Sequence, residues 1–460
     1  MIYISKGRIA MNKKVPRILI AGTGSGCGKT TVSCAVLQAL VKRGLKISAF
    51  KCGPDYIDTM FHKKVIGAAS SNLDPFFFDD NTLKYLLIKN SQGSDISVIE
   101  GVMGFYDGMN VGSVKASTYD VSRITKTPVL LVVDAKGAAL SVLAVIHGFL
   151  SFYPENQICG VVLNRCTVGT YKMLADEIGK RFNNRVKPLG FLPAMPECAI
   201  ESRHLGLVTA DEITDLKNKL DALASRAEET IELDWILKIA KNSEAVCADE
   251  ISLPEYEPVR IAVAKDNAFC FYYKDSMEVL KELGAEIVEF SPLYDTELPK
   301  NIHGLYLGGG YPELYKEKLS KNKTMLDSIN NALKNDLPCI AECGGFMYLT
   351  EYIGGYPMVG YLKGKSSDNK KLTRFGYVTL TAKKDNMLCK SGEKIPAHEF
   401  HYWDSEMTGA DFTAEKPGGR QWDCVFASDT LYAGYPHFHF WANTEFAVNF
   451  YKACLREKAV

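Results

Sequence analysis

The sequence predicts an α/β protein of two domains, each built on a doubly wound, mostly parallel sheet. The chain has 460 residues, more than one hydrophobic core usually organises. In both halves, short β-branched runs bounded by polar residues alternate with segments of helical periodicity. A glycine-rich stretch near the start separates a strand-like run from a helical one. This alternation is typical of parallel strands with helices on both faces of the sheet.

The first domain is predicted to span residues 1–241. An apolar strand at 17–21 leads into the glycine-rich stretch, and an amphipathic helix at 32–42 follows it. Residues 211–241 have apolar positions at helical spacing and are expected to be helical. The further strands expected in this domain are 47–50, 96–99, 129–133 and 158–163.

The second domain is predicted to span residues 259–460, after a linker at 242–258 that contains two prolines and several acidic residues. Stronger alternation from about Arg374 onward predicts antiparallel strands around the site. Strands are expected at 259–264, 286–290, 303–307 and 338–343, and helices at 275–283 and 314–333.

Composition excludes several classes of protein. Lys and Arg total 54, as do Asp and Glu, so no general basic surface favours nucleic acid or a membrane. The longest apolar run, 127–133, has the length of a buried strand, and the N-terminal segment lacks the apolar core of a secretion signal. Thirteen cysteines without short-range metal spacing favour reduced thiols, and hence a cytoplasmic protein. The sequence does not indicate an oligomeric state.

The stretch 22–31, GTGSGCGKTT, is the most informative motif of the first half. Its glycines allow backbone N–H groups to approach phosphate, Lys29 can reach the β- and γ-phosphates, and the Thr30 hydroxyl can bind Mg²⁺. The spacing departs from a strict Walker A motif, because the first glycine stands one position early, at Gly22. A turn that binds nothing is the alternative. The predicted nucleotide-binding residues of this loop are Gly22, Thr23, Gly24, Ser25, Gly26, Cys27, Gly28, Lys29, Thr30 and Thr31.

Two acidic motifs follow predicted strands. Asp55 belongs to KCGPDYID and Glu100 opens EGVMGFYDG. Because ligands of open α/β sheets bind beyond the carboxyl ends of the strands, both acids are predicted to meet Thr30 at a Mg²⁺ site. The alternative is that they cap turns or pair with surface lysines.

In the second half, Cys343 lies between an apolar strand and a helix-compatible stretch, in AECGGF. This is the context of a nucleophile elbow, where a strained turn exposes the nucleophile and the following helix favours the thiolate. The N–H groups of Gly344 and of Gly309, in LGGGYPE, are predicted to form an oxyanion hole. From spacing alone, an ordinary buried cysteine is the alternative.

A general base is expected from the segment PHFHF near the C-terminus. His437 and His439 would share one face of a strand, and either can activate a thiol. A purely structural histidine pair is the alternative.

The motifs GTGSGCGKTT, KCGPDYID, EGVMGFYDG and SRHLGLV (202–208) resemble the cobyrinic acid a,c-diamide synthase family, whose synthetase domain is related to dethiobiotin synthetase. The resemblance implies a P-loop NTPase-like, ATP-binding amide synthetase domain. It implies metal or phosphate contacts for Asp55 and Glu100, and places Asp58 and Asp107 near a phosphorylated carboxylate.

Two further residues are assigned, Asn164 from the same resemblance and Tyr56 from its place in the sequence alone. Asn164, after the strand 158–163, stands where this family reads adenine. Tyr56 is predicted to contact the substrate because it adjoins Asp55.

The second half resembles a class I (triad) glutamine amidotransferase domain, which is flavodoxin-like. The usual C-terminal motif, ending His-Pro-Glu, aligns with His439, Phe440 and Trp441, so the resemblance selects His439 as the base. The triad glutamate is absent because Trp441 stands there, which leaves open what orients the base. The segment 397–402, AHEFHY, also resembles the family and is assigned to the active-site lining or the interdomain surface, with packing as an equal alternative.

Together, these resemblances imply ATP- and glutamine-dependent amidation of the a and c carboxylates of cobyrinic acid, a step of cobalamin biosynthesis. An acyl phosphate would form from ATP, and Cys343-dependent hydrolysis of L-glutamine would supply ammonia. Nickel-sirohydrochlorin and hydrogenobyrinic acid remain alternative tetrapyrrole substrates, because the ATP and glutamine motifs are shared. A P-loop switch ATPase would carry a signature lysine at Gly24, and a nucleotide-binding scaffold would not need Cys343 and His439.

Overall fold

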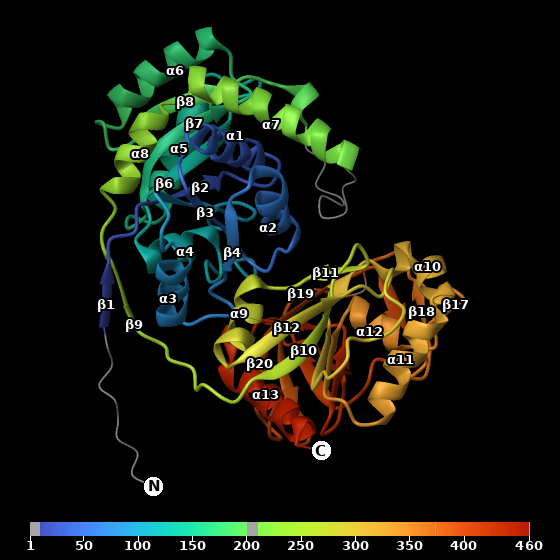
Figure 1. Cartoon of the computed structure of the whole chain (residues 1–460). Coiled ribbons are helices and arrows are strands. Elements are labelled where there is room, and N and C mark those ends of the chain that lie inside the picture. Colours follow the sequence, from blue (N-terminus) through green and yellow to red (C-terminus); the bar gives the residue numbers. More distant parts are fainter. Residues whose placement is uncertain (1–9, 200–209, 373, 460) are drawn as a thin grey trace. The chain divides into compact units, whose positions relative to one another are not determined.

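The computed structural model describes residues 10–199, 210–372 and 374–459, and the chain divides into two compact units, Met1–Ile251 and Ser252–Val460 (Figure 1). The motif at 202–208 lies outside the described residues. Each unit contains a parallel or mostly parallel sheet between helices, which confirms the predicted fold class.

The first unit is built on a seven-stranded sheet in which every pairing is parallel. The five strands predicted from apolar β-branched runs are all present, and two further strands, β4 and β8, complete the two edges. In order across the sheet, the strands are β4 (Ala69–Leu73), β3 (Ile47–Cys52), β5 (Ile96–Glu100), β2 (Arg17–Gly22), β6 (Val129–Asp134), β7 (Ile158–Asn164) and β8 (Lys187–Leu192).

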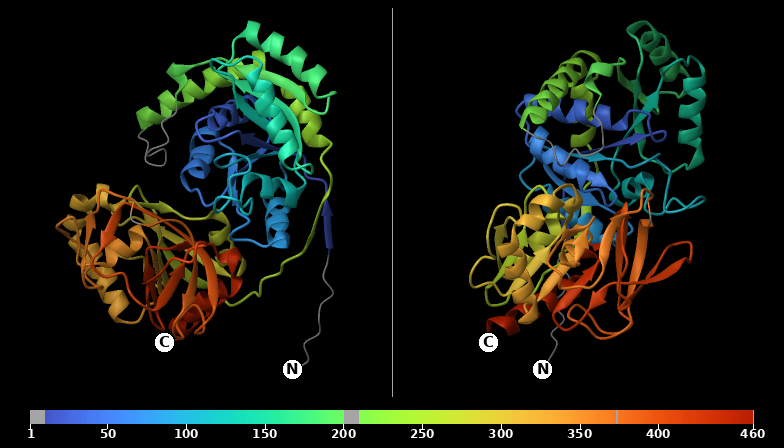
Figure 2. Two further views of the ribbon diagram at one scale, coloured as in Figure 1. Left: turned by 180° about the vertical axis from the view of Figure 1, so that it is seen from behind. Right: turned by 90° about the vertical axis from the view of Figure 1, so that its right-hand side faces the viewer.

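Helices cover both faces of this sheet (Figure 2). On one face, Ile18 and Ile20 share a core with apolar side chains of α1 (Lys29–Lys42), α7 (Ala210–Thr230) and α8 (Leu233–Lys241). Right-handed crossovers place the helices that enter β5, β6, β7 and β8 on the opposite face. These helices are α3 (Asp80–Asn90), α4 (Thr118–Thr125), α5 (Ser141–Phe152) and α6 (Val168–Arg181). Two short helices, α2 (Ile57–Phe61) and the π-helix His62–Ile66, join β3 to β4.

The segment predicted as one helix over 211–241 is two helices. Ile231, between α7 and α8, forms an isolated bridge with Gly190 of β8 and therefore leaves the helical conformation. A Cβ atom on Gly190, whose φ is +125°, would overlap the Thr230 carbonyl oxygen. The close approach of two backbones, rather than a breaker in the helical sequence, ends α7.

Both ends of the first unit are joined through β1 (Ala10–Lys13), which pairs antiparallel with β9 (Val246–Asp249). The predicted linker 242–258 thus contains a strand of the first unit. Arg17 is completely buried nearby, and its guanidinium donates hydrogen bonds to the carbonyl oxygens of Val15, Thr125, Lys126 and Glu244. Burial lowers the pKa of Arg17 to about 10.

The second unit contains a six-stranded sheet that is parallel except at the β24 edge. Its strands, in order, are β12 (Ala285–Phe290), β10 (Val259–Ala264), β13 (Gly304–Leu307), β15 (Cys339–Glu342), β25 (Leu431–Gly434) and β24 (Phe426–Ala427). The helices of this unit are α9 (Lys274–Glu282), α10 (Lys316–Lys321), α11 (Lys323–Lys334), α12 (Gly344–Leu349) and α13 (Thr444–Lys458). The single helix predicted over 314–333 is interrupted at Asn322, whose side chain donates to the Pro292 and Asp295 carbonyl oxygens.

The antiparallel strands predicted after Arg374 are confirmed. They form a five-stranded sheet of β23 (Gln421–Cys424), β22 (Phe412–Glu415), β19 (Arg374–Ala382), β20 (Lys394–His401) and β26 (His437–Phe438). Two small sheets complete the unit. They comprise β17 (Tyr356–Pro357), β16 (Tyr352–Ile353), β18 (Lys365–Asp368) and β21 (Trp403–Ser405), and the pair β11 (Phe269–Phe271) and β14 (Gly309–Gly310). Across the described ranges, no helix is long and apolar enough to span a membrane.

Candidate functional site

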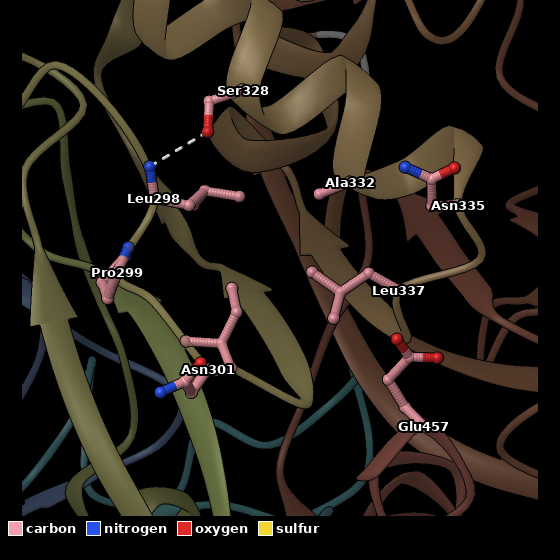
Figure 3. Close-up of a pocket in the computed structure, with 9 residues that line it drawn as sticks. Leu298, Pro299, Asn301, Ser328, Ala332, Asn335, Leu337 and Glu457 are labelled. Atoms are coloured by element: carbon pink, nitrogen blue, oxygen red, sulfur yellow. Dashed lines mark hydrogen bonds between the residues drawn. The ribbon is translucent and has the colours of Figure 1, made fainter. Parts of the chain in front are cut away.

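One surface pocket of the second unit, of about 250 Å³, contains none of the residues predicted for catalysis or binding (Figure 3). Its lining residues are Leu298, Pro299, Asn301, Ile302, Ser328, Ala332, Asn335, Leu337 and Glu457. The predicted residues are found at two other places, one in each unit.

The first place is the turn between β2 and α1, where the loop 22–31 is held closely by residues that follow β7. The Asn164 amide donates to the Cys27 carbonyl oxygen at 3.0 Å, and Arg165 donates to the Gly26 carbonyl oxygen at 3.2 Å. Gly28 has a φ of +92°, and a Cβ atom there would overlap the Asn164 side chain. The structure thus shows Asn164 as a brace of the loop, while its contact with adenine stays a prediction.

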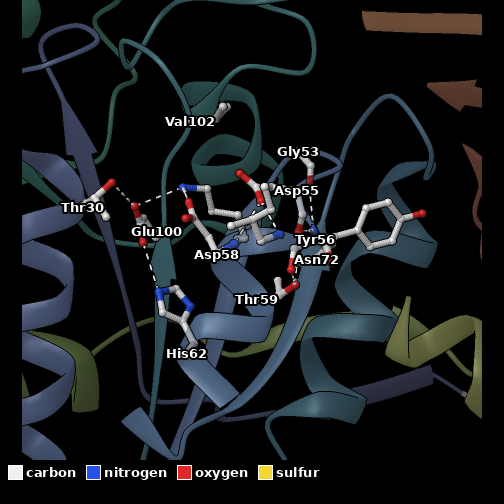
Figure 4. Close-up of polar contacts among 12 residues, drawn as sticks. Thr30, Gly53, Asp55, Tyr56, Asp58, Thr59, His62, Asn72, Glu100 and Val102 are labelled. Atoms are coloured by element: carbon white, nitrogen blue, oxygen red, sulfur yellow. Dashed lines mark hydrogen bonds and ion pairs between the residues drawn. The ribbon is translucent and has the colours of Figure 1, made fainter. Parts of the chain in front are cut away.

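Beside this loop lies a buried group of charged side chains (Figure 4). The Thr30 hydroxyl donates to Oε1 of Glu100 at 2.8 Å, and the Lys51 ammonium lies 3.0 Å from the same oxygen. Lys51 also forms an ion pair with Asp58, and Nε2 of His62 lies 3.2 Å from Oε2 of Glu100. Although burial alone would raise it, Lys51 and His62 hold the pKa of Glu100 well below its usual value.

Of the predicted residues, the structure brings Thr30 into contact with Glu100, and Lys51 joins Glu100 to Asp58. Asp55 and Asp107 instead bind backbone groups of their own turns. Asp55 accepts hydrogen bonds from the backbone N–H groups at positions 57 and 58, and Asp107 accepts one from Gly104. Both carboxylates therefore order their own turns. Burial, with repulsion from Asp58, raises the pKa of Asp55 to about 6. Figure 4 shows the Tyr56 ring directed away from Glu100.

Two residues of this group were not predicted. Lys51 is the first residue of the motif KCGPDYID, and this is the signal that could have identified it. His62 carries no such signal, because it reaches Glu100 only through the π-helix after α2.

Magnesium fits the chemistry of this group in part. Among the described residues, no three His, Cys, Asp or Glu side chains are arranged as a metal-binding cluster. The Thr30 hydroxyl and the Glu100 carboxylate are nevertheless adjacent hard oxygen donors beside the loop. Mg²⁺ commonly takes one or two such protein ligands and completes its coordination with water and phosphate oxygens.

The second place is the end of β15, where the predicted elbow is present. Cys343 has φ and ψ values of 49° and −101°, a strained backbone conformation for a residue other than glycine, and α12 begins directly after it. A Cβ atom on Gly344 would lie 3.0 Å from the Gly310 backbone nitrogen. The elbow and the loop that contains Gly309 therefore pack against each other, as an oxyanion hole requires.

The environment of Cys343 does not favour the thiolate. Burial and then the charge of Glu313 raise the pKa of its thiol, while the Gly344 N–H group opposes them. The helix that was expected to stabilise the thiolate, α12, has only six residues. Cys343 therefore needs a proton acceptor close by if it is to act as a nucleophile.

The two predicted histidines have different surroundings. Nδ1 of His437 lies 3.4 Å from Oε2 of Glu342, and a Cβ atom on Gly309 would lie 2.5 Å from Cε1 of His437. His439 lies beyond the end of β26, where its Nδ1 accepts a hydrogen bond from the Trp441 N–H group. The His439 ring packs against Tyr273, and burial lowers its pKa to about 3.

The segment 397–402 contributes both buried and exposed side chains. His398 stacks on His437 with ring centroids 5.1 Å apart, and His401 stacks on Tyr435 at 3.9 Å. Nε2 of His401 lies 3.1 Å from Oε2 of Glu399. Phe400 and Tyr402 are exposed. The segment thus places His398 against one of the two predicted histidines and His401 against Tyr435.

Comparisons with known proteins find a different family model in each half of the chain. Residues 18–207 match the CobQ/CobB/MinD/ParA nucleotide binding domain, and residues 260–445 match the CobB/CobQ-like glutamine amidotransferase domain. A cobyrinate a,c-diamide synthase of Clostridium acetobutylicum is 42% identical over 438 residues, which cover 93% of this chain and 98% of that protein. Proteins of the same name from Listeria monocytogenes and Priestia megaterium are 40% and 38% identical, each over 96% of this chain and over 100% and 98% of their own lengths.

The chain belongs to the cobyrinate a,c-diamide synthase family. This membership confirms the resemblance drawn from the motifs of both halves. It also confirms the predicted class of enzyme, an amide-forming ligase that contains a glutamine amidotransferase domain. For the first unit, the comparison establishes a nucleotide-binding domain.

Proposed function

We propose that this chain amidates the a and c side-chain carboxylates of cobyrinic acid, using ATP and glutamine. The carrying observation is that one chain contains both a braced phosphate-type loop at 22–31 and a strained Cys343 elbow. Membership of the family over most of the chain supports the choice of substrate.

In the first domain, a substrate carboxylate oxygen attacks the γ-phosphorus of ATP, and the bond to the ADP oxygen breaks. Residues of the loop 22–31 hold the phosphates, and Lys29 and Lys51 supply positive charge. Asp58, Asp107 and Tyr56 are proposed to adjoin the substrate. The product is an acyl phosphate, which has the leaving group that a carboxylate lacks.

Magnesium belongs to the same proposal. Thr30 and Glu100 are its proposed ligands, supported by their mutual hydrogen bond, and Asp55 is proposed as a third. When bound, Mg²⁺ supplies positive charge that offsets the charge of the phosphates.

In the second domain, Cys343 Sγ attacks the glutamine carboxamide, and the Gly344 and Gly309 N–H groups stabilise the oxyanion. Collapse of this intermediate releases ammonia and leaves a thioester, which water hydrolyses to glutamate. Ammonia then attacks the acyl carbon, and phosphate leaves as the amide forms. Exclusion of water would favour amidation over hydrolysis of the acyl phosphate.

The base that takes the Cys343 proton comes from the histidine pair. His439 is the residue selected by the alignment with the triad motif. The contacts of His437 with Glu342 and with the Gly309 loop favour His437. Separate His437→Gln and His439→Gln variants distinguish them, because only loss of the base should abolish glutamine hydrolysis while ammonia-dependent amidation continues.

The test of the proposal is mass spectrometry of cobyrinic acid incubated with ATP, Mg²⁺ and either glutamine or ammonia. Two successive conversions of carboxyl to amide are expected with both nitrogen sources. Cys343→Ala should lose only the reaction with glutamine, and the exposed Cys247→Ala should keep both. Amidation of nickel-sirohydrochlorin or hydrogenobyrinic acid instead would move the proposal to that substrate. ATP hydrolysis without amidation of any of the three would favour a switch ATPase.

A further inference from the structure

Glu342 is a buried carboxylate that directly precedes the proposed nucleophile. The residue as a whole is 1% exposed, and it occupies the last position of β15. Cys339 and Ala341, on alternate positions of that strand, belong to the core shared with α11 and α12. Glu342 therefore projects to the opposite face of the sheet. A carboxylate at such a place needs compensating partners, because burying an unpaired charge is costly.

Both oxygens of Glu342 contact the same short strand, β26. Oε2 lies 3.4 Å from Nδ1 of His437, and Oε1 accepts a hydrogen bond from the Phe438 N–H group at 3.4 Å. The side chains of Glu342 and His437 are 2% and 3% exposed. Water is thus largely excluded from the pair, and its electrostatic interaction is correspondingly strong.

The other edge of the His437 ring faces the proposed oxyanion loop. A Cβ atom built on Gly309 would lie 2.5 Å from Cε1 of His437 and 3.3 Å from its Nε2. Gly310, the next residue, adjoins the elbow at Gly344. The imidazole therefore lies between a carboxylate at Nδ1 and the oxyanion loop beside Nε2. Acid, base and reacting centre follow this order in Ser-His-Asp and related triads.

We propose that Glu342 is the positioning residue that orients His437 for glutamine hydrolysis, in the role of the triad glutamate that Trp441 replaces in the sequence. His437 donates its Nδ1–H to Glu342, which fixes the tautomer with an unprotonated Nε2. That nitrogen accepts the proton of the Cys343 thiol as Sγ attacks the glutamine carbonyl carbon. The negative charge of Glu342 then stabilises the imidazolium until its proton passes to the departing ammonia. This proposal rests on the glutaminase step of the proposed function.

The test compares Glu342→Gln with the wild type in glutamine-dependent and ammonia-dependent amidation. We expect kcat with glutamine to fall by about 100-fold or more, the range for loss of an acid that orients a catalytic base. The KM for glutamine should change little, and the ammonia-dependent rate should be retained. Glu286→Gln, an exposed carboxylate on β12 of the same sheet, is the control and should behave as the wild type.

A pH profile separates positioning from simple packing. Because the carboxylate favours imidazolium, Glu342→Gln should move the acidic limb of the kcat/KM profile for glutamine to lower pH. Glu342→Asp keeps the charge, so it should recover part of the rate and keep the limb near its wild-type position. The other titratable groups beside the pair include His398, stacked on His437, and Tyr306, which contacts Glu342. The buried Tyr272 and Tyr432 also interact electrostatically with Glu342.

Three results would overturn the assignment. If Glu342→Gln has the wild-type kcat and an unchanged pH profile with glutamine, Glu342 has no role in glutamine hydrolysis. If its rates with glutamine and with ammonia fall in parallel, the role of Glu342 is structural. If Glu342→Gln does not fold, an acidic limb in Glu342→Asp that is clearly displaced from its wild-type position also contradicts the proposal. Failure of the proposed function is recognised separately, because wild-type protein would then hydrolyse no glutamine in a Cys343-dependent manner.

Discussion

The Nζ atom of Lys51 lies 3.0 Å from Oε1 of Glu100, and both side chains are almost fully buried. The same ammonium forms an ion pair with Asp58. Burial alone would lower the pKa of Lys51, but Glu100 and Asp58 raise it well above its usual value. Lys51 therefore holds two acidic residues in place beside the phosphate-type loop.

Replacing Lys51 with Met should leave the Glu100 and Asp58 carboxylates buried without their cation. We expect the free energy of unfolding to fall by about 3–5 kcal/mol, the usual cost of removing one member of a buried pair. The exposed Lys42, which pairs with Asp221, is the control, and Lys42→Met should cost no more than about 1 kcal/mol. Urea denaturation measures both variants. Equal losses would show that Lys51 is not compensating buried charge.

Gly28→Ala should weaken ATP binding by roughly tenfold or more, equivalent to about 1.4 kcal/mol. The new methyl group would overlap the Asn164 side chain that braces the loop, and φ at this position is +92°. Gly44→Ala has a similar φ of +80° with open space around the Cβ atom, so it isolates backbone strain. Isothermal titration with ATP should show normal affinity for Gly44→Ala. A similar loss in both variants would remove the Asn164 brace from the explanation.

Gly309→Ala should reduce glutamine-dependent amidation by about 10²–10³-fold, the effect of losing an oxyanion donor. Its Cβ atom would lie 2.5 Å from Cε1 of His437, so either the ring or the loop must move. Ammonia-dependent amidation should continue, because the first domain is unchanged. Gly418→Ala, where the Cβ atom meets nothing within 4 Å, is the control. The rates with glutamine and with ammonia are measured by ADP release and product mass. Equal losses with both nitrogen sources would contradict the prediction.

His439 should make the protein less stable as the pH falls from about 6.5 toward 3. Burial lowers the pKa of His439 from 6.5 to about 3. In this pH range the unfolded chain therefore binds a proton at His439 that the folded chain does not bind. The free energy of unfolding should therefore fall with pH, by at most about 1.4 kcal/mol per pH unit from this residue. Denaturation across this range should show a shallower slope for His439→Gln and an unchanged slope for the exposed His147→Gln. An unchanged slope in His439→Gln would contradict the prediction.

Most strands of the two main sheets were predictable, because a buried parallel strand appears in the sequence as a short apolar run. The exceptions in the first unit are the two edge strands, β4 and β8, and the first of them is polar. Strand β4 reads Ala-Ser-Ser-Asn-Leu, and its Ser70, Ser71 and Asn72 side chains are buried although they are polar. Asn72 donates to the carbonyl oxygens of Gly53 and Asp55, so β4 serves the turn after β3 more than the hydrophobic core. Apolar periodicity cannot reveal such a strand.

The candidate sites were predictable as motifs but not as contacts. The loop 22–31 and the Cys343 elbow each lie within one continuous stretch, where local spacing carries the signal. Glu342 and His437 are 95 positions apart, and Lys51 and Glu100 are 49 apart. Lys51 meets Glu100 because β3 pairs with β5, and Glu342 meets His437 because β15 packs against a strand of another sheet. No local pattern specifies either arrangement. The helix breaks at Ile231 and Asn322 have the same origin, since both residues bind backbone that is distant in sequence.

Arg17 and β1 tie the beginning of the first unit to its end, and this has a consequence for synthesis. The Arg17 guanidinium donates a hydrogen bond to the Glu244 carbonyl oxygen, and β1 pairs with β9. A ribosome delivers the chain from its N-terminus at about 5–20 residues per second. The central strand β2 is therefore made among the first, yet its buried Arg17 lacks one of its hydrogen-bond acceptors, the Glu244 carbonyl oxygen, until residues near 244 have emerged. The β1–β9 pair and this last contact of Arg17 can therefore form only after almost the whole length of the first unit has been made.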